Sequence, residues 1–158
     1  MQESKRLLLK KLKSILAQNL DRAVKARRIT EAIRDEGAYR WVGLYDVDIQ
    51  RGQVSNIAWC GPNAPAYPTF PITKGLTSRA IHERKTVNVG DVASDSSYLT
   101  ALDSTRAEII VPVVDSTGDR VVGTIDVESD KLSAFDAAAQ MLLEECAHVL
   151  KDFWTSGN

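Results

Sequence analysis

The sequence predicts an α+β domain with a central antiparallel sheet, terminal helices on one face of that sheet and ligand-covering loops on the other. Three observations support it: leucines recur at helical spacing near the start, short alternating segments fill the middle, and a second helical stripe closes the chain. The 158 residues are 44% hydrophobic and 26% charged. This composition fits one globular domain over residues 1–158 with a core of its own.

The N-terminal helical region is predicted over residues 1–36. Its apolar stripe consists of residues at helical spacing, namely Leu9, Leu12, Leu16, Leu20, Ala23 and Val24. A second short helical turn is expected from Thr30 to Glu36, where Thr30 can cap the helix and Gly37 can stop it.

The C-terminal helix is predicted over residues 133–154. Ser133 and Asp136 have the spacing of a capping box. They precede a second stripe at helical spacing, formed by Leu142, Cys146, Val149, Leu150 and Phe153. Both terminal helices can cover the sheet, and apolar surface left on them favours a homodimer through these helices.

The middle of the chain reads as short strands joined by turns and two long loops. The expected strands are Arg40–Val47, Val54–Trp59, a piece near Phe70, Thr86–Val89, and the two arms of a hairpin within Ala107–Ser129. Asp48–Gly52 is the first hairpin turn, and Gly75 opens a short helix to Glu83. The loops Cys60–Lys74 and Gly90–Arg106 are long enough to be binding loops or lids.

The hairpin carries three acids on one face. Alternation places Glu108 on the first arm and Asp126 and Glu128 on the second, and pairing that sets Pro112 near Thr124 brings the three carboxylates together. Like charges at that distance repel unless a cation or a shared proton lies among them. The patch is therefore a candidate binding site.

Two interpretations of this face stay open. Acids on an antiparallel sheet often just meet water. The same face also carries Ile110, Pro112, Val114 and Val122, however, and so many apolar side chains favour a covered, partly buried cavity with acids at one end.

Two aromatic residues stand on one side of the first strand. Trp41 and Tyr45 alternate with apolar residues and have Gly43 between them. A cleft between two rings accepts an apolar or cationic group. Paired rings on a strand can equally be core packing, and alternation alone does not show whether they share the face of the acids.

Overall charge excludes some partners. The formal net charge of −1 argues against general nucleic-acid binding. Residues 1–28 are nevertheless strongly basic, which suits a solvated helix face or, as the alternative, an anionic partner or membrane surface. No apolar run reaches the length of a membrane span, and no signal-peptide core is expected at the start.

The cysteines and histidines give no metal-ligand or disulfide pattern. Cys60 and Cys146 are the two cysteines, and His82 and His148 lack partners at ligand spacing. We therefore expect no metal and no cofactor. Two isolated thiols fit a reducing, cytoplasmic location.

A set of motifs spread along the chain resembles the GAF domain family. They are Trp41-Val-Gly-Leu-Tyr45, Gly61-Pro62, Pro65-Ala66-Tyr67, Pro71-Ile-Thr-Lys-Gly75-Leu, Val89-Gly-Asp91-Val, Glu108-Ile-Ile-Val-Pro112 and Gly123-Thr-Ile-Asp126-Val-Glu128-Ser. Within that family the chain is most similar to the free methionine-(R)-sulfoxide reductase branch. GAF domains share a fold and differ widely in function, so the family by itself does not set the activity.

The resemblance implies site residues and also a departure from the branch. A tryptophan and a tyrosine, at Trp41 and Tyr45 here, box the sulfoxide methyl group, and carboxylates at Glu108, Asp126 and Glu128 hold the substrate. Glu128 stands where the branch usually has aspartate. The three cysteines of the branch fall at Tyr67, Thr77 and near Ala101, and none is a cysteine here.

This departure favours a binding function over catalysis, because sulfoxide reduction requires a thiolate nucleophile and a resolving thiol. The first hypothesis is a signalling-type sensor or binding module for an amine-bearing or amino-acid-like ligand, with Trp41, Tyr45, Tyr67, Glu108, Asp126 and Glu128 as the ligand-binding residues. The alternative is a methionine sulfoxide reductase that uses Cys60 in an unusual arrangement. A third possibility is a scaffold with a vestigial cavity.

Overall fold

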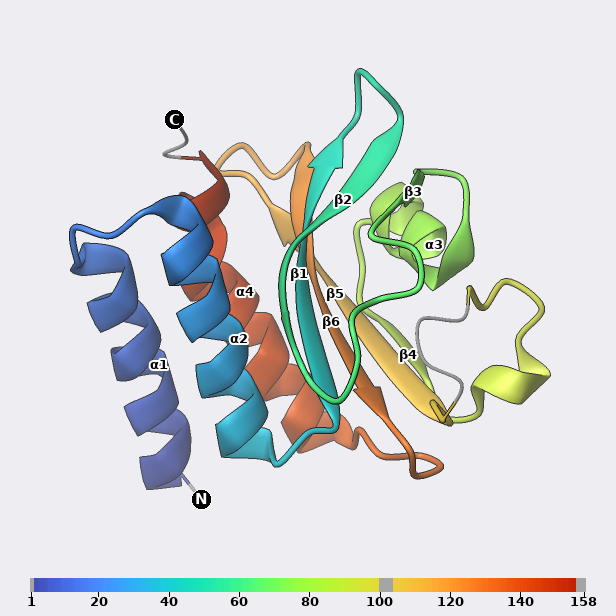
Figure 1. The fold of residues 1–158 in the computed structure, drawn as a ribbon, viewed down its shortest axis with the longest axis horizontal. Coiled ribbons are helices and arrows are strands. Elements are labelled where there is room, and N and C mark those ends of the chain that lie inside the picture. Colours follow the sequence, from blue (N-terminus) through green and yellow to red (C-terminus); the bar gives the residue numbers. More distant parts are fainter. Residues whose placement is uncertain (1, 100–103, 156–158) are drawn as a thin grey trace.

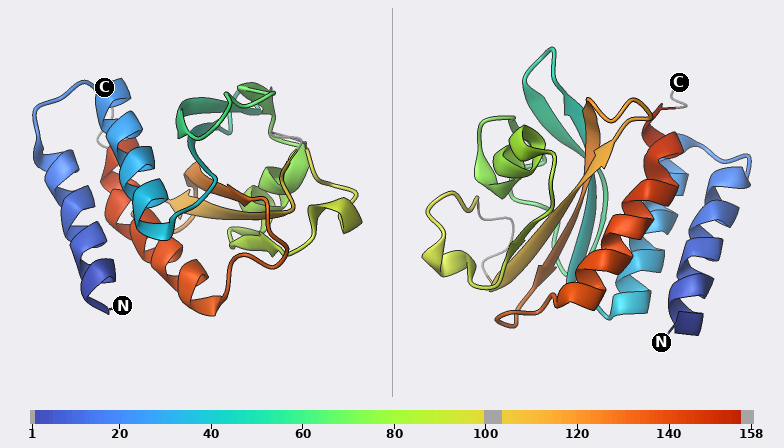
Figure 2. Two further views of the ribbon diagram at one scale, coloured as in Figure 1. Left: turned by 60° about the horizontal axis from the view of Figure 1, so that its bottom comes forward. Right: turned by 180° about the vertical axis from the view of Figure 1, so that it is seen from behind.

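The computed structural model describes residues 2–99 and 104–155 as three layers. Helices α1 (Gln2–Ala17), α2 (Arg22–Gly37) and α4 (Ala137–Thr155) form one outer layer, and helix α3 (Gly75–Glu83) with the loops around it forms the other. The sheet lies between these layers and is seen edge-on in Figure 1, and the right-hand view of Figure 2 shows the same arrangement from behind the molecule. The α+β class is therefore confirmed. No helix within these two ranges is long and apolar enough to cross a bilayer.

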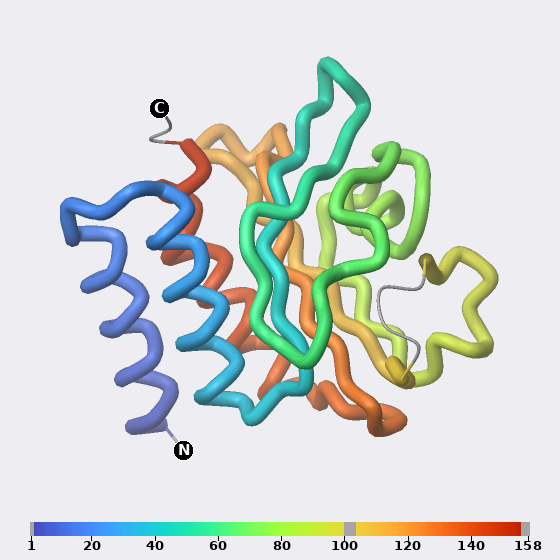
Figure 3. Tube along the Cα trace, in the orientation of Figure 1, coloured from blue at the N-terminus to red at the C-terminus, as the bar shows by residue number. Residues whose placement is uncertain are grey.

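The six described strands form one antiparallel sheet in the order β3-β2-β1-β6-β5-β4. Their bounds are β1 Trp41–Asp48, β2 Gln53–Cys60, β3 Thr69–Pro71, β4 Val87–Val89, β5 Ala107–Val114 and β6 Val121–Ser129. A short 3-10 helix, η1, spans Val92–Ser94. The turn between β1 and β2 projects beyond the sheet, and the segment that follows β2 folds back beside β1 (Figure 3).

The N-terminal region contains two full helices, which corrects the predicted boundaries. The stripe from Leu9 to Val24 is interrupted, because α1 ends at Ala17 and α2 begins at Arg22. The turn lets both helices point their apolar residues into one core, which an uninterrupted rod could not do. Thr30, the expected cap, is buried inside α2 and donates its hydroxyl to the Arg27 carbonyl oxygen at 2.7 Å.

The C-terminal helix begins four residues later than residue 133, the predicted start. The carboxylate of Asp136 accepts a hydrogen bond from the Ala139 N–H at 2.8 Å and so caps α4, whose first residue is Ala137. Ser133 lies outside the helix with a positive φ of 50°. The capping function therefore belongs to Asp136 alone.

A β-bulge changes which side chains share the acidic face at the far end of the hairpin. The register shifts between Val113 and Val114, so that Val121 pairs with Val114. Val121 packs with Trp41 and Tyr45 on the acidic face, whereas Val122 packs against the core under the helices. The prediction that Val122 lies on the acidic face is therefore wrong.

The main core lies between the helices and the sheet, and it fixes the position of β1. Trp154 of α4 donates its indole N–H to the Tyr45 carbonyl oxygen at 3.1 Å. A Cβ atom at Gly123 of β6 would lie 2.1 Å from that indole nitrogen, so only glycine leaves room for the contact. On the opposite face of the sheet, two smaller apolar clusters join residues of α3 to residues of the strands.

Candidate functional site

The three carboxylates of the hairpin lie on the face of the sheet that α3 covers. Glu108 of β5 pairs with Glu128 of β6, and Asp126 pairs with Ile110, which confirms the predicted register. All three side chains are buried, with 6%, 1% and 5% of their residue surfaces exposed for Glu108, Glu128 and Asp126. A merely solvated acidic face is therefore excluded.

The carboxylates meet in a small cavity between the sheet and α3. It has a volume of about 30 Å³, room for roughly two water molecules or a group of similar size. It is lined by Tyr45, Tyr67, Phe70, Gly75, Leu76, Thr77, Leu99, Glu108, Asp126 and Glu128. None of these is a lysine, arginine or histidine, so the carboxylates have no cationic partner among the described residues that line the cavity.

Burial makes the charged forms of these acids costly. It raises the pKa of Glu108 well above its usual value, and the neighbouring Glu128 and Asp126 carboxylates raise it further. Burial raises the pKa of Asp126 to about 8, against a hydrogen bond from Thr124 that favours the charged form. Burial also raises the pKa of Glu128 to about 7. Without a cation, the site holds protons near neutral pH.

Hydrogen bonds satisfy only part of this cluster. Thr124 Oγ1 donates to Asp126 Oδ1 at 2.8 Å, and the Tyr98 hydroxyl donates to Glu128 Oε1 at 3.3 Å. Glu128 Oε2 is buried and has no partner within hydrogen-bonding geometry among the described residues, and the same is true of Thr105 Oγ1. The Thr105 hydroxyl nevertheless lies close enough to Glu128 to favour its charged form and so to lower its pKa, against the larger effect of burial. A buried carboxylate oxygen that accepts no hydrogen bond is costly, so a donor at this atom would stabilise the ionised form of Glu128.

The structure puts both predicted aromatic residues on the carboxylates' face but treats them differently. Trp41 pairs with Glu128 and Tyr45 with Thr124, so the rings do share that face. Tyr45 lines the cavity, whereas Trp41 does not and is fully buried. A Cβ atom at Gly43 would lie 2.3 Å from the Trp41 ring and 3.2 Å from that of Tyr45, so the indole fills the space over this glycine. A ligand contact by Trp41 stays a prediction.

Tyr67 lines the cavity from the loop after β2 and remains 49% exposed. Sequence reasoning missed Phe70 and Leu99 as lining residues and Tyr98 as a donor to Glu128. Tyr98 and Leu99 lie in a turn-rich segment without periodicity, so alternation could not assign them to this face.

Both cysteines lie away from the cavity. Cys60 pairs with Val42, which packs into the helix-side core, and its sulfur contacts Arg34 Nη1 of α2 at 4.0 Å. Cys146 is buried in the same core, where burial raises the pKa of its thiol to about 12. The sheet therefore separates both thiols from the carboxylates.

Two of the three positions at which the resemblance places reductase cysteines lie at the cavity. Tyr67 and Thr77 both line it, and Ala101 falls outside the described residues. No cysteine is among the described residues that line this cavity. No group of three or more histidine, cysteine or acidic side chains within the described ranges is arranged to hold a metal ion.

A sheet backed by helices on one side, with a covered polar cavity on the other, is the architecture of a small-molecule-binding fold. The family model described as GAF domain matches residues 20–152, and the chain belongs to this family.

Three relatives show how the similarity is distributed. GAF domain-containing protein A of Dictyostelium discoideum is 25% identical over 143 residues, covering 90% of this chain and 87% of that protein. The free methionine-R-sulfoxide reductase of Saccharomyces cerevisiae is 25% identical over 112 residues, covering 70% of this chain and 60% of that enzyme. The solved structure of the free methionine-R-sulfoxide reductase of Neisseria meningitidis has a TM-score of 0.85 and 27% identity, covering 96% of this chain and 89% of that one.

Proposed function

We propose that this GAF domain is a non-catalytic sensor or binding module that recognises a small molecule through a protonated amine. The observation that carries the proposal is the buried Glu128 Oε2, which has no donor among the described residues and lies beside Glu108 and Asp126. An ammonium group supplies three donors and a positive charge, which favours the ionised form of the carboxylates.

The size and walls of the cavity indicate which part of the ligand enters it. A volume of about 30 Å³ suits an ammonium head but not a drug-sized molecule. The apolar part of the ligand would lie against Tyr45 and Phe70, which are in edge contact with ring centroids 5.8 Å apart.

The start of α3 offers a second anchor beside the cavity. Lys74 occupies its N-cap position without a side-chain cap, and Gly75 at the head of the helix lines the cavity. The first backbone N–H groups of a helix bind carboxylates. A free amino acid, with an amine and a carboxylate on one carbon, satisfies both anchors.

The positions of the thiols support binding rather than reduction. A sulfoxide held by the carboxylates would meet the side chains of Tyr67 and Thr77, and neither can act as a nucleophilic or resolving thiol. Cys60 would have to reach such a ligand from the opposite face of the sheet.

A thermal-shift screen of free amino acids and amines, followed by calorimetric titration of any hit, tests the proposal. We expect an amine-bearing compound to stabilise the protein and Glu108→Gln to weaken its binding at least tenfold. The matched control is Glu83→Gln, at an exposed position on α3 outside the cavity lining, which should bind like the wild type. If no cationic compound stabilises the protein, or if Glu108→Gln leaves binding unchanged, the proposal is wrong.

The reductase relatives favour a second candidate, a sulfoxide reductase that uses Cys60. Turnover of free methionine sulfoxide coupled to thioredoxin tests it. Turnover that disappears in Cys60→Ser would establish the enzyme. If the wild type binds methionine or methionine sulfoxide but does not turn the sulfoxide over, the result would support the sensor.

Two further parts of the proposal concern the protein's context. We propose a homodimer through the terminal helices, supported by Leu7 of α1 and Met141 of α4, each 60% exposed. Light scattering of wild type and Met141→Glu tests it, and a concentration-independent monomer would contradict it. A cytoplasmic location is supported by the two free thiols.

A further inference from the structure

A large hollow lies at one end of the helix layer, across the sheet from the carboxylate cavity. It has a volume of about 730 Å³ and is formed by the C-terminal ends of α1 and α4 together with the start of α2. Its walls include the apolar residues Leu16, Ala17, Leu20, Val149 and Phe153. Leu16, Leu20 and Val149 are only half-buried, so this floor is open to solvent.

The rim of this hollow is basic, and the fold explains only part of its charge. Arg22 forms a two-pronged ion pair with Asp46 at 2.7 and 3.0 Å, and Lys25 donates to the Leu16 carbonyl oxygen at 2.9 Å. Lys13 and Lys151 face the same hollow and form no ion pair with the described residues.

Helix dipoles do not account for these two lysines either. A cation stabilises a helix C-terminus mainly within the last turn. Neither α1 nor α4 has a basic residue in its last turn, so Lys13 and Lys151 both lie further back. Their shared property is that they approach one apolar hollow from two different helices.

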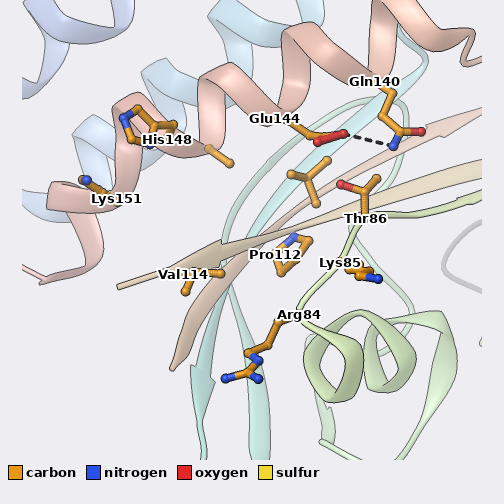
Figure 4. Close-up of a pocket in the computed structure, with 11 residues that line it drawn as sticks. Arg84, Lys85, Thr86, Pro112, Val114, Gln140, Glu144, His148 and Lys151 are labelled. Atoms are coloured by element: carbon orange, nitrogen blue, oxygen red, sulfur yellow. Dashed lines mark hydrogen bonds between the residues drawn. The ribbon is translucent and has the colours of Figure 1, made fainter. Parts of the chain in front are cut away.

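The basic surface continues around α4. His148 and Lys151 also line a second hollow of about 480 Å³, where Arg84 and Lys85 lie across the end of β5 from them (Figure 4). β4 pairs with β5 only as far as Ile110, so the outer edge of β5 beyond it has no partner strand among those described.

Charge on this surface differs from that of the chain as a whole. The two hollows together are lined by six lysines and arginines but only two acids: Lys13, Arg22, Lys25, Arg84, Lys85 and Lys151 against Glu144 and Asp152. The whole chain has 20 basic and 21 acidic residues. Complementarity therefore favours an anionic partner.

We propose that this basic helix-end surface binds an acidic amphipathic peptide segment of a partner protein. The apolar floor would receive the hydrophobic side chains of the segment, and Lys13 and Lys151 would face its carboxylates. The open floor would leave a small ligand largely exposed, which favours a longer segment.

Two other anionic partners fit the surface less well. Single-stranded nucleic acid is typically held by base stacking on exposed rings, but Phe153 is buried and the Arg22 guanidinium covers its ring, with its carbon 4.8 Å from the ring centroid. A bilayer presents a flat anionic surface, whereas these hollows are concave and lie on two sides of α4.

Fluorescence anisotropy with a labelled amphipathic peptide, leucines on one helical face and glutamates on the other, tests the proposal. We expect saturable binding that weakens with added salt and falls about tenfold or more in the double variant Lys13→Glu/Lys151→Glu, since two attractive charges become repulsive. The matched control is Lys10→Glu, an exposed residue of α1 outside the hollow, which should bind like the wild type.

Further probes separate the outcomes. Thermal unfolding and amine binding by the double variant check that it is folded. A scrambled peptide of the same composition, single-stranded DNA and anionic vesicles should bind at least tenfold more weakly than the amphipathic peptide. The proposal is overturned if the wild type does not bind the peptide, if the folded double variant binds it equally well, or if DNA or vesicles bind more tightly. Self-association that the double variant abolishes, without peptide binding, would assign the surface to a second copy of the chain.

Discussion

The buried carboxylates should make the ligand-free protein less stable as the pH rises. The substitution Glu128→Gln should remove much of this loss in the free energy of unfolding. The pKa of Glu128 rises from 4.5 to about 7 and that of Asp126 from 3.8 to about 8 on folding. The folded state therefore holds protons that the unfolded state has released. Stability that is present below about pH 4 is lost as the pH rises through these folded-state values.

The size of the effect follows from the pKa of Glu128. The rise from 4.5 to about 7 is about 2.5 units, and at about 1.36 kcal/mol per unit it corresponds to roughly 3 kcal/mol as an upper bound. Glu128→Gln keeps the shape of the side chain and removes the charge. It should raise the free energy of unfolding by roughly 2–3 kcal/mol near pH 8.5 and by less than about 1 kcal/mol near pH 5.

Urea unfolding of ligand-free protein between about pH 5 and pH 9, followed by tryptophan fluorescence, measures these free energies. Glu83→Gln, at an exposed site, is the control and should retain the wild-type pH profile. A wild-type stability that stays flat or increases over this range would refute the reasoning, as would a Glu128→Gln variant that is less stable near pH 8.5.

Three further predictions follow from single contacts. Gly123→Ala should destabilise the protein by about 1–3 kcal/mol in urea unfolding, because a Cβ atom would lie 2.1 Å from the Trp154 indole nitrogen. A loss of less than about 0.5 kcal/mol would contradict the close packing of Trp154 on Gly123. Tyr98→Phe removes the hydroxyl that donates to Glu128 and should weaken calorimetric amine binding about threefold to tenfold; unchanged affinity would mean the phenol does not support the site. Cys60→Ser should leave amine affinity unchanged, since its side chain lies on the helix side of the sheet, and a marked loss would contradict that placement.

Local alternation predicted the central part of the site because one strand pair holds it. Glu108, Asp126 and Glu128 belong to a single hairpin, and their convergence follows from period-two geometry and the Pro112–Thr124 register. The same rule failed beyond Val113, because a bulge shifts the register there. Strict alternation assumes an unbroken register, and Pro112 and Gly123, which flank the bulge, do not by themselves show where the extra residue falls.

Features that depend on distant contacts were not predictable in this way. Nothing in the strand pattern shows that the Trp41 ring lies over Gly43, or that Tyr98 reaches Glu128 from a loop. The apolar stripe continues through the break between α1 and α2, so helical spacing does not predict that break. Both helices contribute to one core, which is a tertiary constraint rather than a local one.

The most direct test of the central claim is calorimetric titration of an amine-bearing ligand at neutral pH, in two buffers with different ionisation enthalpies. An ammonium group that enters the cavity converts protonated carboxyl groups into carboxylates, so binding should release protons and the observed heat should depend on the buffer. Glu128→Gln should reduce both affinity and proton release. Binding with no proton release, or equal affinity and release in wild type and Glu128→Gln, would contradict the claim that the buried carboxylates receive the cation.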